Sequence, residues 1–127
     1  MAACAKWQSD LILDAALDYI ATSTMMNVCS DQPATYAEAT ATYDLATHVV
    51  AAGDFAKADG AVSGRKVTIA EQATITVDHS GTATGVFLGI TVGTLRVFIT
   101  TCTSQALVAA NTVTVPAWTI TFADVTA

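Results

Sequence analysis

The chain has 127 residues, a formal net charge of −6 and a sequence pI of about 4.4. Charged residues make up only 13% of it, about half the fraction in an average globular protein. Its five Lys and Arg residues include one adjacent pair, so the chain lacks the clustered basic charge that direct nucleic-acid binding needs. No apolar run reaches the roughly 18 residues that span a bilayer. The N-terminus lacks a signal-peptide pattern, so we expect a single domain over residues 1–127, made in a cytoplasm and not bound to a membrane.

With so little charge, Ala, Thr and Ser must form much of the surface, and a surface of that kind is often covered by a neighbouring protein. The alternative is a threonine-coated monomer. The three cysteines, Cys4, Cys29 and Cys102, are widely spaced and odd in number. They are therefore interpreted as free thiols that pack as small hydrophobic residues, not as disulfides or zinc ligands.

Residues Asp10 to Ala21 are predicted to form the one long helix. Ser9 is a suitable N-cap, and Asp10 places a negative charge in the first turn. An aspartate stripe recurs every four residues, and the remaining positions form a broad apolar face that must pack on something. The stripe consists of Asp10, Asp14 and Asp18; the apolar face consists of Ile12, Leu13, Ala16, Leu17, Tyr19 and Ile20. The stripe is interpreted as a solvated face, with a metal or a basic partner surface as the alternative.

The next segments predict a strand within Thr22 to Ser30 and a turn at Asp31-Gln32-Pro33, where proline cannot continue a ladder. Residues 35–50 are ambiguous, because alanine favours a helix in the first half and alternation from Tyr43 to Val49 favours a strand in the second. Residues 51–64 carry three glycines and two aspartates and are predicted to be the longest loop, with a tight turn at Asp59-Gly60. They lack the spacing of an EF-hand calcium loop.

From Arg65 onward, short strands with threonine on one side are predicted around residues 67–69, 74–77 and 112–115. A further strand follows from residue 118, where Trp118, Ile120 and Phe122 share a face. Residues 102–109 are predicted to be looser. The fold class is therefore mainly β: an antiparallel β-sandwich, Ig-like or related, over about residues 24–124, with one N-terminal helix.

The central feature of the sequence is a hairpin over Gly85 to Thr101. A two-residue II′ turn at Gly93-Thr94 would pair Ile90 with Val97 and Leu88 with Ile99, and would place Phe98 across from Gly89. One face then faces the interior, formed by Val86, Leu88, Ile90, Val92, Leu95, Val97 and Ile99. We expect the other face, with Phe87, Arg96 and Phe98, to be covered by the N-terminal helix or by an adjoining subunit.

No motif in the chain specifies a reaction. Asp78-His79-Ser80 contains the residue types of a hydrolytic triad, but consecutive turn residues point in different directions, so we expect no catalysis there. The two histidines, His48 and His79, do not combine with a cysteine pair into a zinc pattern. We therefore expect no enzyme activity, no metal, no cofactor and no small-molecule substrate.

Charged positions near the long loop, in the hairpin and on the helix are the candidates for protein contacts. Arg65 and Lys66 are the only basic doublet and suit an acidic neighbouring subunit, although they also suit a solvated strand end. Arg96 lies inside the hairpin and suits a carboxylate at an interface. The candidate interface residues are Asp59, Gly60, Arg65, Lys66, Arg96, Asp10, Asp14 and Asp18.

Four stretches resemble small, Ala/Thr-rich virion proteins of tailed bacteriophages, and together they cover nearly the whole chain. They are WQSDLILDAALDYIAT, MNVCSDQPATYAEATATYDLA, GDFAKADGAVSGRKVTIA and TTCTSQALVAANTVTVPAWTI. The resemblance implies a structural component of the virion, in the first place a head decoration or cement protein. Its partners would be the major capsid protein and copies of itself. The alternatives are a tail, connector or fibre-associated module, one form of which is an Ig-like domain that binds the host surface.

Overall fold

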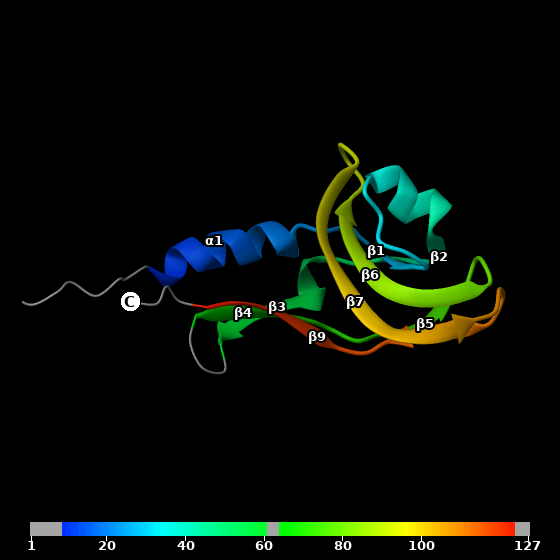
Figure 1. Cartoon of the computed structure of the whole chain (residues 1–127). Helices are drawn as coiled ribbons and strands as arrows, with labels where there is room; N and C mark the ends of the chain where they lie inside the picture. The colour runs from blue at the N-terminus through cyan, green and yellow to red at the C-terminus, as the bar shows by residue number, and fades with distance from the viewer. Residues whose placement is uncertain (1–8, 61–63, 124–127) are drawn as a thin grey trace, which may run out of the picture.

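The computed structural model describes residues 9–60 and 64–123 and shows a mainly β protein with one N-terminal helix, which confirms the predicted fold class. The strands form three antiparallel sheets, ordered β2-β1-β6-β7, β3-β4-β9 and β5-β8. Figure 1 shows an arm, formed by α1 and the β3-β4-β9 sheet, that extends from a body formed by the other strands in a sandwich-like arrangement. The elements are α1 (Asp10–Ala21), β1 (Met25–Cys29), η1 (Glu38–Thr42), β2 (Asp44–Val49), η2 (Ala52–Asp54), β3 (Phe55–Asp59), β4 (Arg65–Ile69), β5 (Gln72–Thr76), β6 (Gly81–Ile90), β7 (Leu95–Leu107), β8 (Thr112–Val115) and β9 (Trp118–Phe122).

Helix α1 has the predicted bounds, and local side chains fix both of its ends. The Ser9 hydroxyl accepts a hydrogen bond from the Leu11 N–H at 3.1 Å and caps the first turn. At the other end, the Thr22 hydroxyl donates to the Tyr19 carbonyl and the Ser23 hydroxyl donates to the Ile20 carbonyl. These bonds satisfy carbonyls that a helix end leaves without partners, so the chain leaves the helix here and continues into β1.

The core lies between the curved β2-β1-β6-β7 sheet and the β5-β8 sheet, and it continues into the arm beneath α1. Within the arm, α1 buries Leu13, Leu17 and Ile20, each worth about 1.5–3 kcal/mol of apolar transfer free energy. They pack on the face of the sheet that carries Val67 and Ile69, both fully buried. Trp118, Ile120 and Phe122 alternate with Thr119 and Thr121 along β9, which pairs in regular register with β4.

The predicted hairpin is present, but its predicted register is wrong. Ile90 pairs with Leu95, Gly89 with Arg96 and Leu88 with Phe98, because a bulge at Val97 shifts the ladder. The turn has four residues, 91–94, with a hydrogen bond from the Thr94 N–H to the Thr91 carbonyl. The positive φ of Gly93 suits the third position of such a turn.

The bulge also changes which side chains share a face. Phe98 packs towards the main core and its ring lies 6.1 Å from that of Trp118, whereas Ile99 joins Phe87 on the other face. The ring that lies against Gly89 is that of Phe87, not Phe98: a Cβ on Gly89 would lie 2.6 Å from Phe87 Cε1. Val92 and Leu95, predicted to be interior, are exposed at the hairpin tip.

Helix α1, one of the two expected covers of the second hairpin face, does not lie on it. Phe87 is fully buried in a separate cluster with Cys29 and Ala39, against which Tyr36, Tyr43 and Ile99 pack. The cover is therefore the segment between β1 and β2, which includes the π-helical turn η1. Helix α1 instead covers β3 and β4.

Two segments predicted to be irregular are strands. The predicted loop 51–64 contains β3, which pairs with β4 along its whole length. The predicted loose region 102–109 is largely β7, which runs to Leu107 and is bulged opposite Thr84. Residues 61–63 of the predicted loop lie outside the described residues. The ambiguous segment divides as its composition indicated, into η1 and then β2.

Candidate protein-interaction surface

Two ion pairs fasten α1 to the sheet of the arm, and a third joins two strands of that sheet. Arg65 donates from Nε to Asp14 Oδ1 at 2.8 Å and from Nη1 to Asp59 Oδ1 at 2.7 Å. These hydrogen bonds, the one to Asp14 first, raise the pKa of Arg65. Lys57 Nζ lies 2.6 Å from Asp18 Oδ1. Much of the aspartate stripe is therefore bound to basic residues of the chain's own β3 and β4.

The structure brings some of the eight candidate residues together and separates others. Asp14, Asp59 and Arg65 form one cluster, and Gly60 closes the end of β3 with a hydrogen bond from its N–H to the Gly64 carbonyl. Lys66 follows Arg65 in the strand, so it faces the opposite side of the sheet. Asp10 is exposed at the start of α1. Arg96 lies on the body, where Nη1 is 3.4 Å from the Pro33 carbonyl oxygen.

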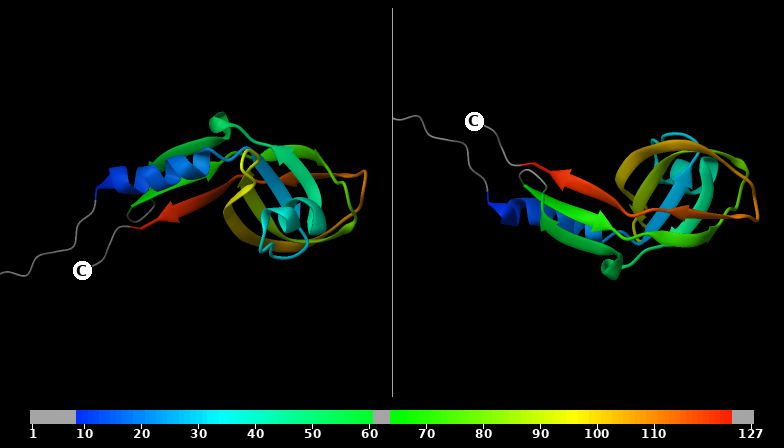
Figure 2. Two further views of the ribbon diagram at one scale, coloured as in Figure 1. Left: turned by 90° about the horizontal axis from the view of Figure 1, so that it is seen from above. Right: turned by 90° about the horizontal axis from the view of Figure 1, so that it is seen from below.

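Helix α1 uses only one of its two apolar faces. Leu17 is fully buried, whereas Leu11 is 77% exposed, Ile12 is 63% exposed and Tyr19 is 49% exposed. The exposed side chains follow the helical repeat on the side away from the sheet. We call this the outer helix face; it consists of Leu11, Ile12, Ala15, Ala16 and Tyr19. Figure 2 shows α1 over one face of the arm sheet and the other face left open.

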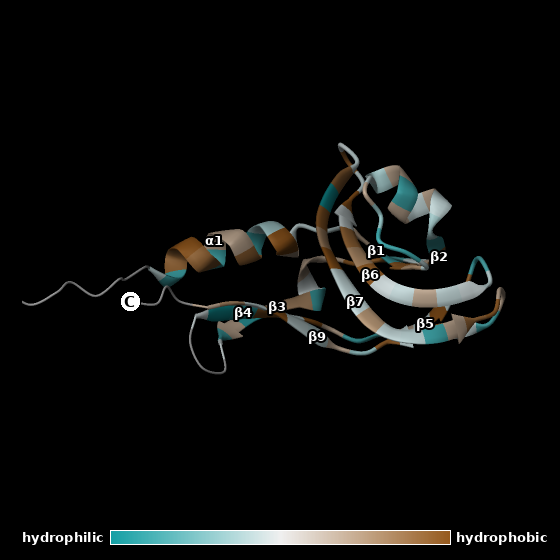
Figure 3. Cartoon of the chain, in the orientation of Figure 1, coloured by the Kyte–Doolittle hydropathy of each residue, from teal (hydrophilic) through white to brown (hydrophobic). Residues whose placement is uncertain are grey.

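The β6-β7 hairpin tip adds exposed apolar side chains beside the C-terminal end of α1. Thr24, just after α1, accepts a hydrogen bond at its hydroxyl from the Thr91 N–H at 3.0 Å, which holds the tip beside the end of the helix. Val92 is 84% exposed, and Leu95 is also exposed. The views in Figures 1 and 2 place α1 and the tip on the same side of the molecule. Figure 3 shows hydrophobic residues along α1 and in the upper part of β7.

This surface was only partly foreseeable from the sequence. The helical pattern predicted that Ile12 and Tyr19 must pack on something, and the structure leaves both exposed. The alternation of apolar residues in the hairpin predicted that Val92 would be interior, but the structure leaves it exposed. A possible signal was the width of the apolar face: it is broader than the single stripe that one sheet can cover.

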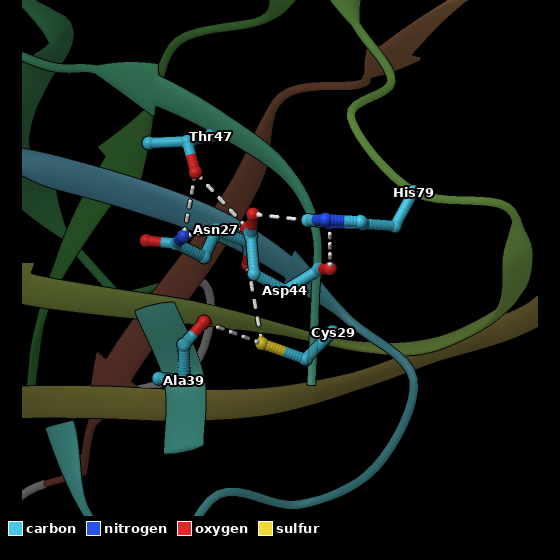
Figure 4. A network of polar contacts seen from close by, with 6 residues as sticks. All are labelled: Asn27, Cys29, Ala39, Asp44, Thr47 and His79. Carbon is cyan, nitrogen blue, oxygen red and sulfur yellow. Dashed lines mark hydrogen bonds and ion pairs between the residues drawn. The ribbon is translucent and has the colours of Figure 1, made fainter. Parts of the chain in front are cut away.

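A buried polar network joins side chains of the neighbouring strands β1 and β2 in the body sheet (Figure 4). The Asn27 side-chain N–H donates to Asp44 Oδ1 at 2.7 Å and to Thr47 Oγ1 at 2.9 Å, and Thr47 donates to the same carboxylate at 3.0 Å. His79 Nδ1 lies 3.0 Å from the Asp44 carbonyl. Asn27 is fully buried and Asp44 is buried. These contacts join β1, β2 and the turn before β6.

The side chains of the Asp78-His79-Ser80 turn have separate environments. His79 reaches β2, whereas the Ser80 hydroxyl accepts a hydrogen bond from the Ala109 N–H at 2.9 Å. Within residues 9–60 and 64–123, no three His, Cys, Asp or Glu side chains cluster in a way that could hold a metal ion. In the same part of the chain, no helix is both long and apolar enough to cross a membrane.

Cys29 is the buried thiol beside this network. Its Sγ lies 3.6 Å from the Ala39 carbonyl, and burial, reinforced by Asp44, raises its pKa to about 12. Cys102 is exposed on β7. A cavity of about 270 Å³ adjoins Cys29, between the segment after β1 and the outer face of the hairpin. A neutral thiol of high pKa is a packing group and a poor nucleophile.

The stability of the protein should depend on pH through Cys29. In the unfolded chain the Cys29 thiol has a pKa of about 8.5. The folded state therefore binds the thiol proton more tightly than the unfolded state does. The resulting stabilisation is complete below about pH 8.5 and falls as pH rises toward 12. We expect Cys29→Ala to flatten this alkaline decline, measured by urea unfolding at a series of pH values. Parallel curves for the two proteins would contradict the assignment.

Comparisons of the chain with protein families, curated proteins and solved structures found no match.

Proposed function

We propose that the protein is a structural component of a tailed-phage virion, and that it acts as a head decoration or cement protein through protein–protein contacts. The observation that carries the proposal is the outer helix face, left exposed together with the hairpin tip. Exposed apolar surface of this kind is typical of a contact site. The resemblance to Ala/Thr-rich virion proteins supplies the particular setting.

The surface suits weak contacts that are repeated over a lattice. Each of Leu11, Ile12 and Tyr19, if a partner covered it fully, would contribute about 1.5–3 kcal/mol of apolar transfer free energy. The free-energy cost of association offsets part of this gain. One contact of this size is weak, but copies held at many equivalent positions bind through multivalency. The net charge of −6 keeps the free subunits apart in solution.

The ion pairs of the arm support this role by fixing the helix. Arg65 pairs with Asp14 and Lys57 pairs with Asp18, and the residues of the outer helix face are all uncharged. Neutral side chains can be buried against a capsid protein without leaving an unpaired charge. The candidate residues Asp14, Asp18, Asp59 and Arg65 would thus position the surface, and its apolar neighbours would make the contact.

The test is a binding titration on purified phage heads that lack this protein. Wild-type protein should saturate the heads at a fixed ratio to the major capsid protein. The double variant Ile12→Glu/Tyr19→Glu should bind at least about tenfold more weakly. The matched control, Ala56→Glu/Thr121→Glu, adds the same charge on the open face of the arm sheet and should bind like wild type.

Three results would count against the proposal. Equal binding of the helix variant and the control would remove the outer helix face as the contact site. Saturation of purified tails or connectors, without binding to heads, would favour the tail or connector module. Binding to host cells alone would favour a host-recognition domain.

A further inference from the structure

A gap separates β7 on one side from β8 of the body and β9 of the arm sheet on the other. In the described part of the chain, β7 pairs only with β6, β8 only with β5 and β9 only with β4. No backbone hydrogen bond between described residues joins β7 to β8 or β9. At one end the gap is closed by side chains, where Phe98 of β7 meets Trp118 of β9. Two unpaired strand edges therefore face the same groove.

Two adjoining cavities occupy this groove, each of about 220 Å³. They share four residues, Val86, Cys102, Val115 and Pro116, and extend in opposite directions along β7. Val86 and Val115 are buried, so the groove reaches into the main core. None of the residues that line either cavity is charged. We call this feature the seam groove.

We propose that the seam groove binds an uncharged, extended segment of a partner protein, which adds as a strand along β7 and places two small apolar side chains in the two cavities. Strand edges present N–H and C=O groups in a row, and the ligand that matches such a row is another polypeptide strand. Alternate side chains of a strand point to the same side, about 7 Å apart. Adjoining cavities with a shared wall suit two such side chains.

One further observation supports a strand as the occupant. Trp118, which lines the second cavity, has a buried indole N–H with no acceptor within the described residues. A carbonyl of the bound strand could satisfy this donor, whose desolvation otherwise costs free energy.

The charge pattern favours a partner segment over a second copy of this chain. Two of the three sheet-edge strands outside the groove carry titratable side chains: β2 has Asp44 and His48, and β3 has Lys57 and Asp59. The third, β5, is uncharged, but it lies beside β2, and an isolated bridge joins Val77, just after β5, to Ala46 of β2. Charged side chains match poorly with a groove that offers no countercharge. An uncharged strand with valine or alanine at alternate positions has no such penalty.

The test uses a synthetic peptide, Gly-Thr-Val-Thr-Val-Thr-Val-Gly, acetylated, amidated and extended by two lysines for solubility. It is titrated into isotopically labelled full-length protein, and the backbone amide resonances are followed by NMR. We expect saturable shifts in β7 and in residues 112–119. A peptide N-methylated at alternate residues cannot donate to β7, so it should bind at least about tenfold more weakly. This comparison needs no protein variant.

A matched pair of variants locates the site. Cys102 lines both cavities, so the larger side chain of Cys102→Trp should occupy space in them and reduce binding about tenfold or more. Thr121→Trp, on the open face of the arm sheet, should not reduce binding. Absence of saturable shifts, shifts confined to other elements, or equal binding of the N-methylated peptide would overturn the proposal. A dimer of the free protein that Cys102→Trp dissociates would overturn it in favour of a second copy.

Discussion

Replacing Leu17 with alanine is expected to lower the free energy of unfolding by about 3 kcal/mol. Leu17 is fully buried between α1 and the sheet of the arm, so the truncation leaves a cavity that the surrounding strands cannot readily fill. Urea unfolding measures the loss. Amide hydrogen exchange should also accelerate in α1, because Leu13 and Ile20 are the only other buried residues of the helix.

Leu11→Ala is the matched control, since it removes the same atoms from the exposed side of the same helix. Its effect should stay within about 0.5 kcal/mol. Equal losses for the two variants would mean that α1 packs through its outer helix face in solution. That result would also remove the surface on which the proposed function depends.

Replacing Asp44 with alanine is expected to cost about 2–3 kcal/mol. The carboxylate accepts hydrogen bonds from Asn27 and Thr47. Thr47 is exposed, but Asn27 is fully buried and would lose this acceptor. Asp44→Asn keeps one side-chain oxygen, so its cost should be less than half as large. Chemical denaturation of the three proteins measures the difference.

Asp78→Ala provides the control for this series, because Asp78 is an exposed aspartate in the turn that follows β5. It should change the free energy of unfolding by less than about 0.5 kcal/mol. A similar cost at Asp44 and Asp78 would show that the buried network contributes little. Full restoration by Asp44→Asn would show that an amide oxygen alone satisfies the donors.

Local signals in the sequence account for the elements that were predicted correctly. Ser9 and Asp10 mark the start of α1, and the change to β-branched residues at Thr22 marks its end. Alternation from Trp118 to Phe122 identifies both the strand β9 and the face that it buries. In each case the evidence lies within about a dozen neighbouring residues.

The errors arose where the deciding contact is distant in sequence. The pattern Phe-Ala-Lys-Ala-Asp of β3 gives little strand signal, and its strand geometry comes from pairing with β4. The hairpin register depends on a bulge at Val97 that lets Phe98 reach Trp118, twenty residues away in the chain. Periodicity within the hairpin cannot reveal a partner of that kind.

The candidate site shows the same division. The charges of Asp14, Asp18, Lys57 and Arg65 were visible in the sequence, but their pairing within one arm was not. The sequence also showed an apolar helix without saying which side chains would stay exposed. The seam groove had no sequence signal, because it is bounded by strands that lie close in space without pairing.

By itself, the sequence determined an acidic, weakly charged, mainly β chain with one amphipathic helix, since composition and short-range periodicity are properties of the chain alone. The tertiary structure decided which apolar face of α1 is buried, because β3 and β4 can cover only one side of a helix. It also decided which strand edges stay open, since a ladder forms only where the fold brings two edges into register. The surfaces available for contact are therefore what remains after the core is packed.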